Sequence, residues 1–261
     1  MRRIAEPVAI AAILTALAAP AAAQHHHHHA PGDAEAAPRI QAHAGLSLEA
    51  GRVDFLGGER DYQGLALMAG ASRGRFELAA HVPFYRLELG DSWGEGPGDP
   101  HLEARWVALR SGALDAGVSF AVMPPVGDDD KGLAMGHWMI MTGGFARLTR
   151  GRFATSASLG YGGALGGGGH AEHGGGVWPP VAPMNGHEIE GSLQETVTLG
   201  RFGLGASLSG ATPLGDGLTL ALVGVGATIN LGRMELGVGV GHGLLDHPAG
   251  LRATTHAMAS F

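Results

Sequence analysis

The chain has 261 residues, of which 46 are Gly, 14 are Pro and none is Cys. Without Cys there is no disulfide scaffold. Glycine at more than twice its usual share of about 7% argues against a soluble helical protein. A formal net charge of −7 at pH 7 disfavours nucleic acid as a partner. With 45% hydrophobic residues the chain is too apolar for disorder, so a glycine-rich β-protein remains.

The chain begins with the pattern of an export signal. Arg2 and Arg3 precede an apolar run over residues 8–19, and three alanines follow at 21–23. This pattern predicts a signal peptide, residues 1–23, cleaved after Ala23. The apolar run is shorter than the ~20 residues that a membrane-spanning helix needs. We expect residues 24–42, which include five consecutive histidines, to be a His-rich disordered segment, and residues 43–261 to be the folded domain.

From His43 onward, apolar and polar residues alternate with a period of two. Phe76 and Leu78 alternate with Glu77, for example, and Met234 and Leu236 alternate with Glu235. Such alternation predicts strands with one face in an apolar medium. About twelve candidate strands of roughly 10–14 residues can be counted, whereas strands of globular proteins average about 5–6. An even number of long strands favours a membrane-spanning barrel.

Short and longer connections alternate along the chain, as in outer-membrane barrels. Gly supplies the positive φ of tight hairpin turns, and five short turns contain it: residues 72–75, 110–113, 149–152, 199–202 and 231–234. Longer connections are predicted at residues 54–61, 88–98, 124–135 and 165–186. Arginines gather at the short turns and acidic residues in the longer loops. The alternative that these charges are only solvated strand ends remains open.

These features predict an all-β fold, an antiparallel up-and-down transmembrane β-barrel of about twelve strands in the outer membrane of a Gram-negative bacterium. The terminal Phe261 is similar to the C-terminal signature that the barrel-assembly machinery recognises. Glu195 falls on the lipid-facing side of its strand, which predicts a bulge or a position near the membrane interface. A secreted soluble β-sandwich or β-solenoid is the competing fold.

One stretch, residues 83–148, carries a set of family features. They are Pro83-Phe84, the run Gly98-Asp99-Pro100, the pair Arg105-Trp106, and the loop Pro125-Val126-Gly127-Asp128. In these features the stretch resembles the bacterial family named for the MetA-pathway of phenol degradation. The loop over residues 165–183 departs from that family in its Gly and His content. The resemblance implies a small outer-membrane channel for hydrophobic or aromatic compounds, and it carries over no functional residues.

The polar side of the strands supplies candidates for the lining of a lumen. Residues two apart in a strand project to the same face, so Glu103 and Arg105 can pair there. The candidate lumen residues are Glu77, His81, Tyr85, Glu103, Arg105, Glu190 and His256. The sequence contains no Gly-x-Ser-x-Gly motif, and we expect no catalytic activity.

The 15 histidines suggest a second function. Neutral imidazole binds Zn²⁺, Cu²⁺ and Ni²⁺, and a His-x-x-His pair in a glycine-rich loop can close around such an ion. The candidate metal ligands are His25, His26, His27, His28, His29, His170, His173 and His187. The histidine run can equally be neutral low-complexity sequence.

The function expected from the sequence is therefore passive passage of small hydrophobic or aromatic solutes, with outer-membrane lipid and the solute as partners. No cofactor is required for this. The alternatives are capture or passage of Zn, Cu or Ni, and a structural barrel without transport activity.

Overall fold

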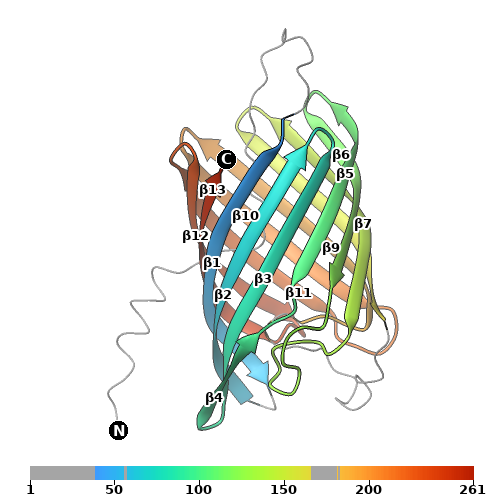
Figure 1. The fold of residues 1–261 in the computed structure, drawn as a ribbon, viewed down its shortest axis with the longest axis vertical. Helices are drawn as coiled ribbons and strands as arrows, with labels where there is room; N and C mark the ends of the chain where they lie inside the picture. The colour runs from blue at the N-terminus through green and yellow to red at the C-terminus, as the bar shows by residue number, and fades with distance from the viewer. Residues whose placement is uncertain (1–38, 56–57, 166–180, 182) are drawn as a thin grey trace.

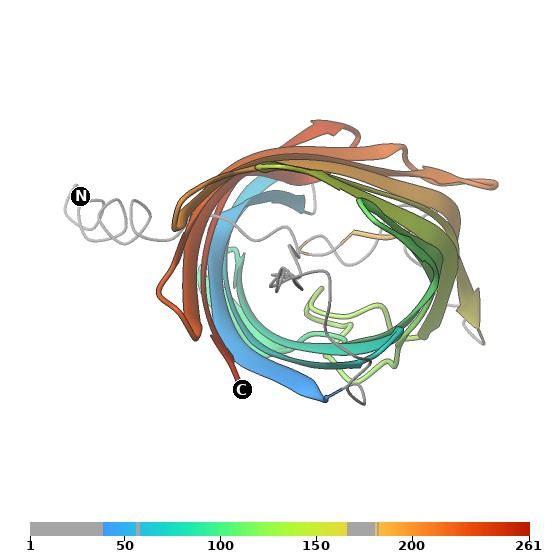
Figure 2. The same cartoon turned by 90° about the horizontal axis from the view of Figure 1, so that it is seen from above.

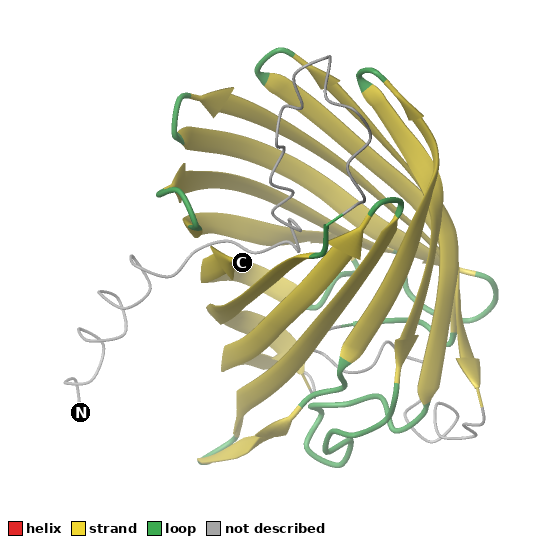
Figure 3. Ribbon diagram, turned by 45° about the horizontal axis from the view of Figure 1, so that its top comes forward, coloured by secondary structure: helices red, strands yellow, loops and turns green. Residues whose placement is uncertain are grey.

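A computed structural model describes residues 39–55, 58–165, 181 and 183–261 of the chain. The described part is all-β (Figure 3). Its strands are β1 (Gln41–Phe55), β2 (Gly58–Arg73), β3 (Phe76–Leu89), β4 (Ser92–Pro97), β5 (His101–Ser111), β6 (Leu114–Met123), β7 (Trp138–Arg150), β8 (Phe153–Leu165), β9 (His187–Leu199), β10 (Phe202–Pro213), β11 (Leu220–Asn230), β12 (Met234–Leu245) and β13 (Ala249–Ser260). In the described residues no helix is long and apolar enough to cross a membrane.

The strands form one closed antiparallel barrel (Figures 1 and 2). Neighbours in sequence pair all the way round, and β1 closes the ring by pairing with both β2 and β13. Strands β4 and β5 both pair with β3, each along a different part of it. They are thus two parts of one interrupted strand. The wall therefore has twelve strands, which confirms the fold predicted from the alternation.

The two faces of the wall differ as the alternation predicts. Outward side chains are apolar and exposed, such as Leu67 (58% exposed) and Leu78 (60%). Inward side chains alternate with them and are covered, such as Tyr62 (1%) and Glu188 (2%). An apolar exterior of this kind suits lipid. The closed ring suits it as well, because every backbone group of the strands then has a hydrogen-bond partner within the barrel.

The five predicted short turns all lie at one end of the barrel, the upper end in Figure 1. Each contains a glycine at positive φ: Gly74 (61°), Gly112 (56°), Gly151 (59°), Gly200 (64°) and Gly232 (83°). The C-terminus lies at the same end. There the Phe261 N–H donates to the Ala42 carbonyl at 2.8 Å, which extends the β1–β13 pairing that closes the ring.

The structure corrects two predicted loops at the other end. Most of the predicted loop at residues 54–61 belongs to strands, because β1 and β2 pair up to Phe55 and Gly58, and residues 56 and 57 lie outside the described part. Residues 88–98 form a tight β3–β4 hairpin, with Gly90 at a φ of 67°. In the paired strands these backbone N–H and C=O groups bond to each other, whereas in an open loop they would bond to water. The ladder also reaches Gln41 and Ala42, the last two residues of the predicted tail.

The outward carboxylate of Glu195 does not cause a bulge. The ladders on both sides of β9 are in continuous register through this residue. Its side chain accepts a hydrogen bond from the Thr155 hydroxyl on β8. Glu195 is four residues from the end of β9, so the near-interface position is the reading that the structure supports.

Candidate functional site in the barrel lumen

The interruption between β4 and β5 is the main irregularity of the wall. It consists of Gly98, Asp99 and Pro100, between Pro97 and His101. Pro100 has no N–H to give to a ladder, and β3 changes partner at this height. The Gly98 N–H still donates to the Pro83 carbonyl at 3.0 Å, so the wall stays joined at one point.

Asp99 turns from this interruption toward the mouth loop, which we define as residues 124–137. One carboxylate oxygen accepts the N–H groups of Val126 at 3.0 Å and Gly127 at 3.1 Å. The other accepts the Met135 N–H at 2.7 Å. Asp99 is only 5% exposed. Hydrogen bonds to a charged acceptor away from water are strong, so one side chain holds both ends of the loop.

The mouth loop also carries charged and titratable groups. The ammonium of Lys131 hydrogen-bonds the Asp128 carboxylate and lowers its pKa. Burial lowers the pKa of His137, at the end of the loop.

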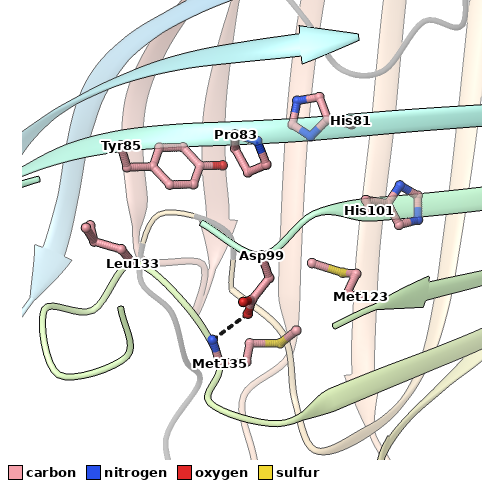
Figure 4. A pocket seen from close by; sticks show the side chains of 8 residues that line it. All are labelled: His81, Pro83, Tyr85, Asp99, His101, Met123, Leu133 and Met135. Carbon is pink, nitrogen blue, oxygen red and sulfur yellow. Dashed lines mark hydrogen bonds between the residues drawn. The ribbon is translucent and has the colours of Figure 1, made fainter. Parts of the chain in front are cut away.

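The loop and the wall enclose a cavity of about 90 Å³ (Figure 4). Its lining is mostly apolar, with two imidazoles, two thioethers and a phenol ring. The lining residues are His81, Pro83, Tyr85, Asp99, His101, Met123, Leu133 and Met135. His81 and His101 are directly opposite on β3 and β5. Neither forms a hydrogen bond with another residue that the structure describes. We call this cavity the mouth pocket.

A cluster of buried apolar side chains stands beside the mouth pocket. Leu133 of the mouth loop is fully buried and packs with Tyr85 and Leu87 of β3. Val53, Tyr62, Val181 and Ala249 complete the cluster. The mouth loop is therefore held inside the barrel opening by apolar burial as well as by Asp99.

Toward the end with the short turns, the lumen becomes polar. The Arg105 Nε donates to the Glu103 carboxylate at 2.7 Å, two residues away on the same face of β5. Glu77 is opposite Arg105 on β3. The Arg105 guanidinium lies 5.6 Å from the ring centre of Phe145, which faces inward from β7. This wall thus offers both charges and an aromatic face to a solute.

The opposite wall is polar as well. His256 of β13 lies 3.4 Å from the Glu235 carboxylate of β12. Glu188 of β9 accepts hydrogen bonds from the backbone N–H and the side-chain amide of Asn185, at 2.9 and 2.8 Å. Inward acidic side chains outnumber inward arginines around the barrel. The acidic ones are Glu49, Glu77, Glu103, Asp115, Glu188, Glu190 and Glu235, and the arginines are Arg60, Arg105, Arg110, Arg147 and Arg252.

The structure places all seven candidate lumen residues on inward positions of the wall. It brings together Glu77, Glu103 and Arg105 on β3 and β5, and His81 and Tyr85 in the mouth pocket. Glu190 and His256 lie on other parts of the wall, on β9 and β13. Sequence reasoning missed His101, although it lies two residues before Glu103 on the same face. It also missed the loop residues Leu133 and Met135, for which no local pattern exists.

The structure describes only one of the eight predicted metal ligands. His25, His26, His27, His28, His29, His170 and His173 lie outside the described residues. His187 is described, and its Nδ1 is 2.8 Å from the Tyr161 hydroxyl, with the two rings stacked. Among the residues that the structure describes, no three His, Asp or Glu side chains come together as metal ligands.

No protein-family model and no curated protein matches the sequence. Solved structures do match. An outer membrane channel from Pseudomonas putida F1 is similar with a TM-score of 0.63 at 15% identity, covering 89% of this chain and 99% of that one. The translocator domain of the autotransporter NalP from Neisseria meningitidis gives 0.49 at 13% identity, covering 85% and 88%. The CymD monoaromatic hydrocarbon channel gives 0.43 at 8% identity, covering 87% and 89%.

The first of these similarities covers almost the whole of both chains, and it concerns the fold. Both the alternation and the family resemblance led us to expect an outer-membrane barrel. The chain accordingly has the closed β-barrel fold of an outer-membrane channel.

Proposed function

We propose that the protein is a passive outer-membrane channel for small solutes, and that it favours solutes carrying a single apolar ring. The observation that carries the proposal is the pairing of an apolar mouth pocket with a polar lumen inside a closed, lipid-compatible barrel. Assembly into the membrane would use the terminal Phe261, whose backbone already completes the closing strand pair.

The mouth pocket suits an aromatic ring in chemistry and in size. Thioethers such as those of Met123 and Met135 make favourable contacts with aromatic rings. The pocket volume of about 90 Å³ is of the order of the ~150 Å³ apolar cavity known to hold benzene. The imidazoles of His81 and His101 can hydrogen-bond a polar substituent on such a ring. A ring held at the mouth would next meet Phe145 and the charged lumen.

The test is a flux assay with the full mature chain in liposomes. Benzyltrimethylammonium and tetramethylammonium carry the same permanent charge, so neither crosses lipid readily, and only the first has a ring. We expect the ratio of benzyltrimethylammonium flux to tetramethylammonium flux to be higher through this channel than through an open water-filled pore. The proposal would be contradicted if this flux ratio equalled that of an open pore, or if neither ion crossed.

A pocket variant sharpens this test. Met123→Trp fills the mouth pocket, and it should lower the flux of the aromatic ion by several-fold more than that of tetramethylammonium. Thr196→Trp adds the same side chain to the inward face of β9, away from the pocket, and serves as the matched control. If Thr196→Trp lost the preference for the aromatic ion and Met123→Trp kept it, the ring would bind elsewhere in the lumen and not in the mouth pocket.

A further inference from the structure

A three-residue motif recurs at the short-turn end of the barrel. Gly-Arg-Phe occurs at residues 74–76, 151–153 and 200–202, and Gly-Arg-Met at 232–234. In each copy the glycine has positive φ, between 59° and 83°. The arginine follows in the turn, and the apolar residue begins the next strand. The channel function uses none of these residues.

The apolar residue of each motif faces outward. Phe76 is 64% exposed, Phe153 44%, Phe202 49% and Met234 48%. Outward residues at the first position of a transmembrane strand lie at the membrane interface, where aromatic rings are favoured. The motif thus repeats one arrangement around the rim, with an arginine next to an interfacial apolar side chain.

The arginines are held beside these side chains. The guanidinium of Arg152 lies 5.2 Å from the ring centre of Phe153, and that of Arg201 lies 5.5 Å from the ring centre of Phe202. Arg75 donates from one nitrogen to the Ala108 carbonyl at 2.9 Å, which leaves its other donors available. In the described part of the chain, none of these three arginines, nor Arg233, forms an ion pair.

Acidic side chains close to the short turns face away from the outward side of this rim. Within three residues of the turn glycines the acidic side chains are Glu77, Asp115 and Glu235, and all three face inward. Glu195, which faces outward, is five residues from Gly200 and bonds Thr155. The outward rim therefore presents guanidinium groups without acidic side chains beside them.

The opposite end of the barrel provides a contrast. Arg86 lies 4.5 Å from the ring centre of Trp93, an arginine–aromatic pair of the same kind. Glu95 is directly opposite Arg86 in the β3–β4 ladder, and Glu88 is opposite Trp93. The arginine of this hairpin therefore has acidic side chains beside it, in contrast to the arginines of the short-turn rim.

We propose that the Gly-Arg-Phe rim binds the phosphate headgroups of anionic phospholipids in the membrane leaflet at the short-turn end. The inference rests on the membrane placement in the proposed function. A guanidinium presents a planar fork of donors that matches phosphate oxygens, and the neighbouring ring is at the depth of the acyl–headgroup boundary. Binding at three or four copies fixes the height of the barrel in the leaflet.

The test compares phosphatidylglycerol with phosphatidylcholine binding to the full mature chain, by native mass spectrometry from mixed-lipid vesicles. At low salt we expect the wild type to bind phosphatidylglycerol about tenfold more tightly, with the preference lost at high salt. The triple variant Arg75→Gln, Arg152→Gln, Arg201→Gln should bind the two lipids within about twofold of each other. Arg86→Gln, in the hairpin with acidic side chains, is the matched control and should keep the wild-type preference.

Two outcomes would overturn the inference: a wild type without preference, or a triple variant that keeps it. If inorganic phosphate bound at the rim and the protein showed no preference between the two lipids, the rim would be a site for the free ion, and the inference would be overturned as well. Ion flux measured in pure phosphatidylcholine vesicles separates this inference from the channel function. The triple variant should insert and conduct there like the wild type, because its substitutions lie outside the lumen.

Discussion

The carboxylate of Asp99 accepts a 2.7 Å hydrogen bond from the backbone N–H of Met135, across 36 residues of chain. The same side chain binds Val126 and Gly127 at the start of the mouth loop. The interruption of the wall between β4 and β5 therefore supplies the residue that holds the mouth loop in place. Asp99 is free to turn inward because Gly98 and Pro100 take it out of the strand ladder.

Replacing Asp99 by Asn should release the mouth loop. The amide keeps one acceptor oxygen but puts an NH₂ group against N–H donors. Each hydrogen bond to a charged group contributes about 1.5–3 kcal/mol, so opening should become roughly 10- to 100-fold more frequent. Lys131 lies in this loop and is the one lysine of the chain. A lysine-specific protease therefore reports opening by a single cut.

Asp130→Asn is the control for this experiment. Asp130 lies in the same loop and loses the same charge, but it makes no hydrogen bond to another described residue. Its cleavage rate should equal that of the wild type. Equal cleavage of Asp99→Asn and the wild type would show that Asp99 does not hold the loop.

The loop between β12 and β13 should loosen in mild acid. Burial, and then the positive charge of Arg252, lowers the pKa of His247 from 6.5 to about 4. The neutral ring accepts the Ala249 N–H at its Nδ1, at 3.0 Å. In an opened loop the ring would take up its proton near pH 6.5. The closed loop therefore loses stability progressively as the pH falls from about 6.5 to about 4.

Proton NMR of the histidine rings in detergent checks this, with His247→Gln identifying the signal. The midpoint expected for His247 is about 4. A midpoint near the ordinary value of about 6.5 would mean that the ring is solvated and that the loop has no such acid response.

The acidic excess of the lumen should make the channel prefer K⁺ to Cl⁻. Glu103→Gln removes one inward carboxylate and leaves Arg105 without its partner at 2.7 Å. A unit charge about 4 Å from a passing ion is worth about 1 kcal/mol in water, so the K⁺ preference should fall by roughly two- to fivefold. The reversal potential in a KCl gradient across a planar bilayer measures it.

Glu195→Gln makes the same change of charge on the lipid-facing side of β9 and should leave the reversal potential unchanged. If both variants shift it equally, the charge of the whole barrel sets the selectivity, and Glu103 has no special place in the lumen.

Gly117 should not tolerate a side chain. A Cβ at this position on β6 would overlap the backbone oxygen of Trp106 and lie 3.0 Å from the Phe145 ring. Gly117→Ala should therefore destabilise the barrel by about 1–3 kcal/mol. The temperature of its gel-mobility shift on heating should fall. Gly144→Ala on the next strand has its nearest contact at 3.6 Å and should leave that temperature unchanged.

Much of the fold was predictable because its rules are local. Whether Phe76 or Glu77 faces lipid follows from a period of two, and the glycine of each short turn marks where the chain reverses. The inward positions of His81 and Glu103 follow from the same period. The β3–β4 hairpin was not predictable, because Gly-rich residues 88–98 suit a loop as well as a strand.

A barrel of about twelve strands, its inward and outward faces and the ends at which its turns lie could be predicted from the sequence, because each depends on neighbours within a few residues. The folded structure was needed to show that Asp99 binds Met135 and that His101 joins His81 in the mouth pocket. These relationships join residues far apart in the chain. They arise from the closure of the barrel, which no local pattern encodes.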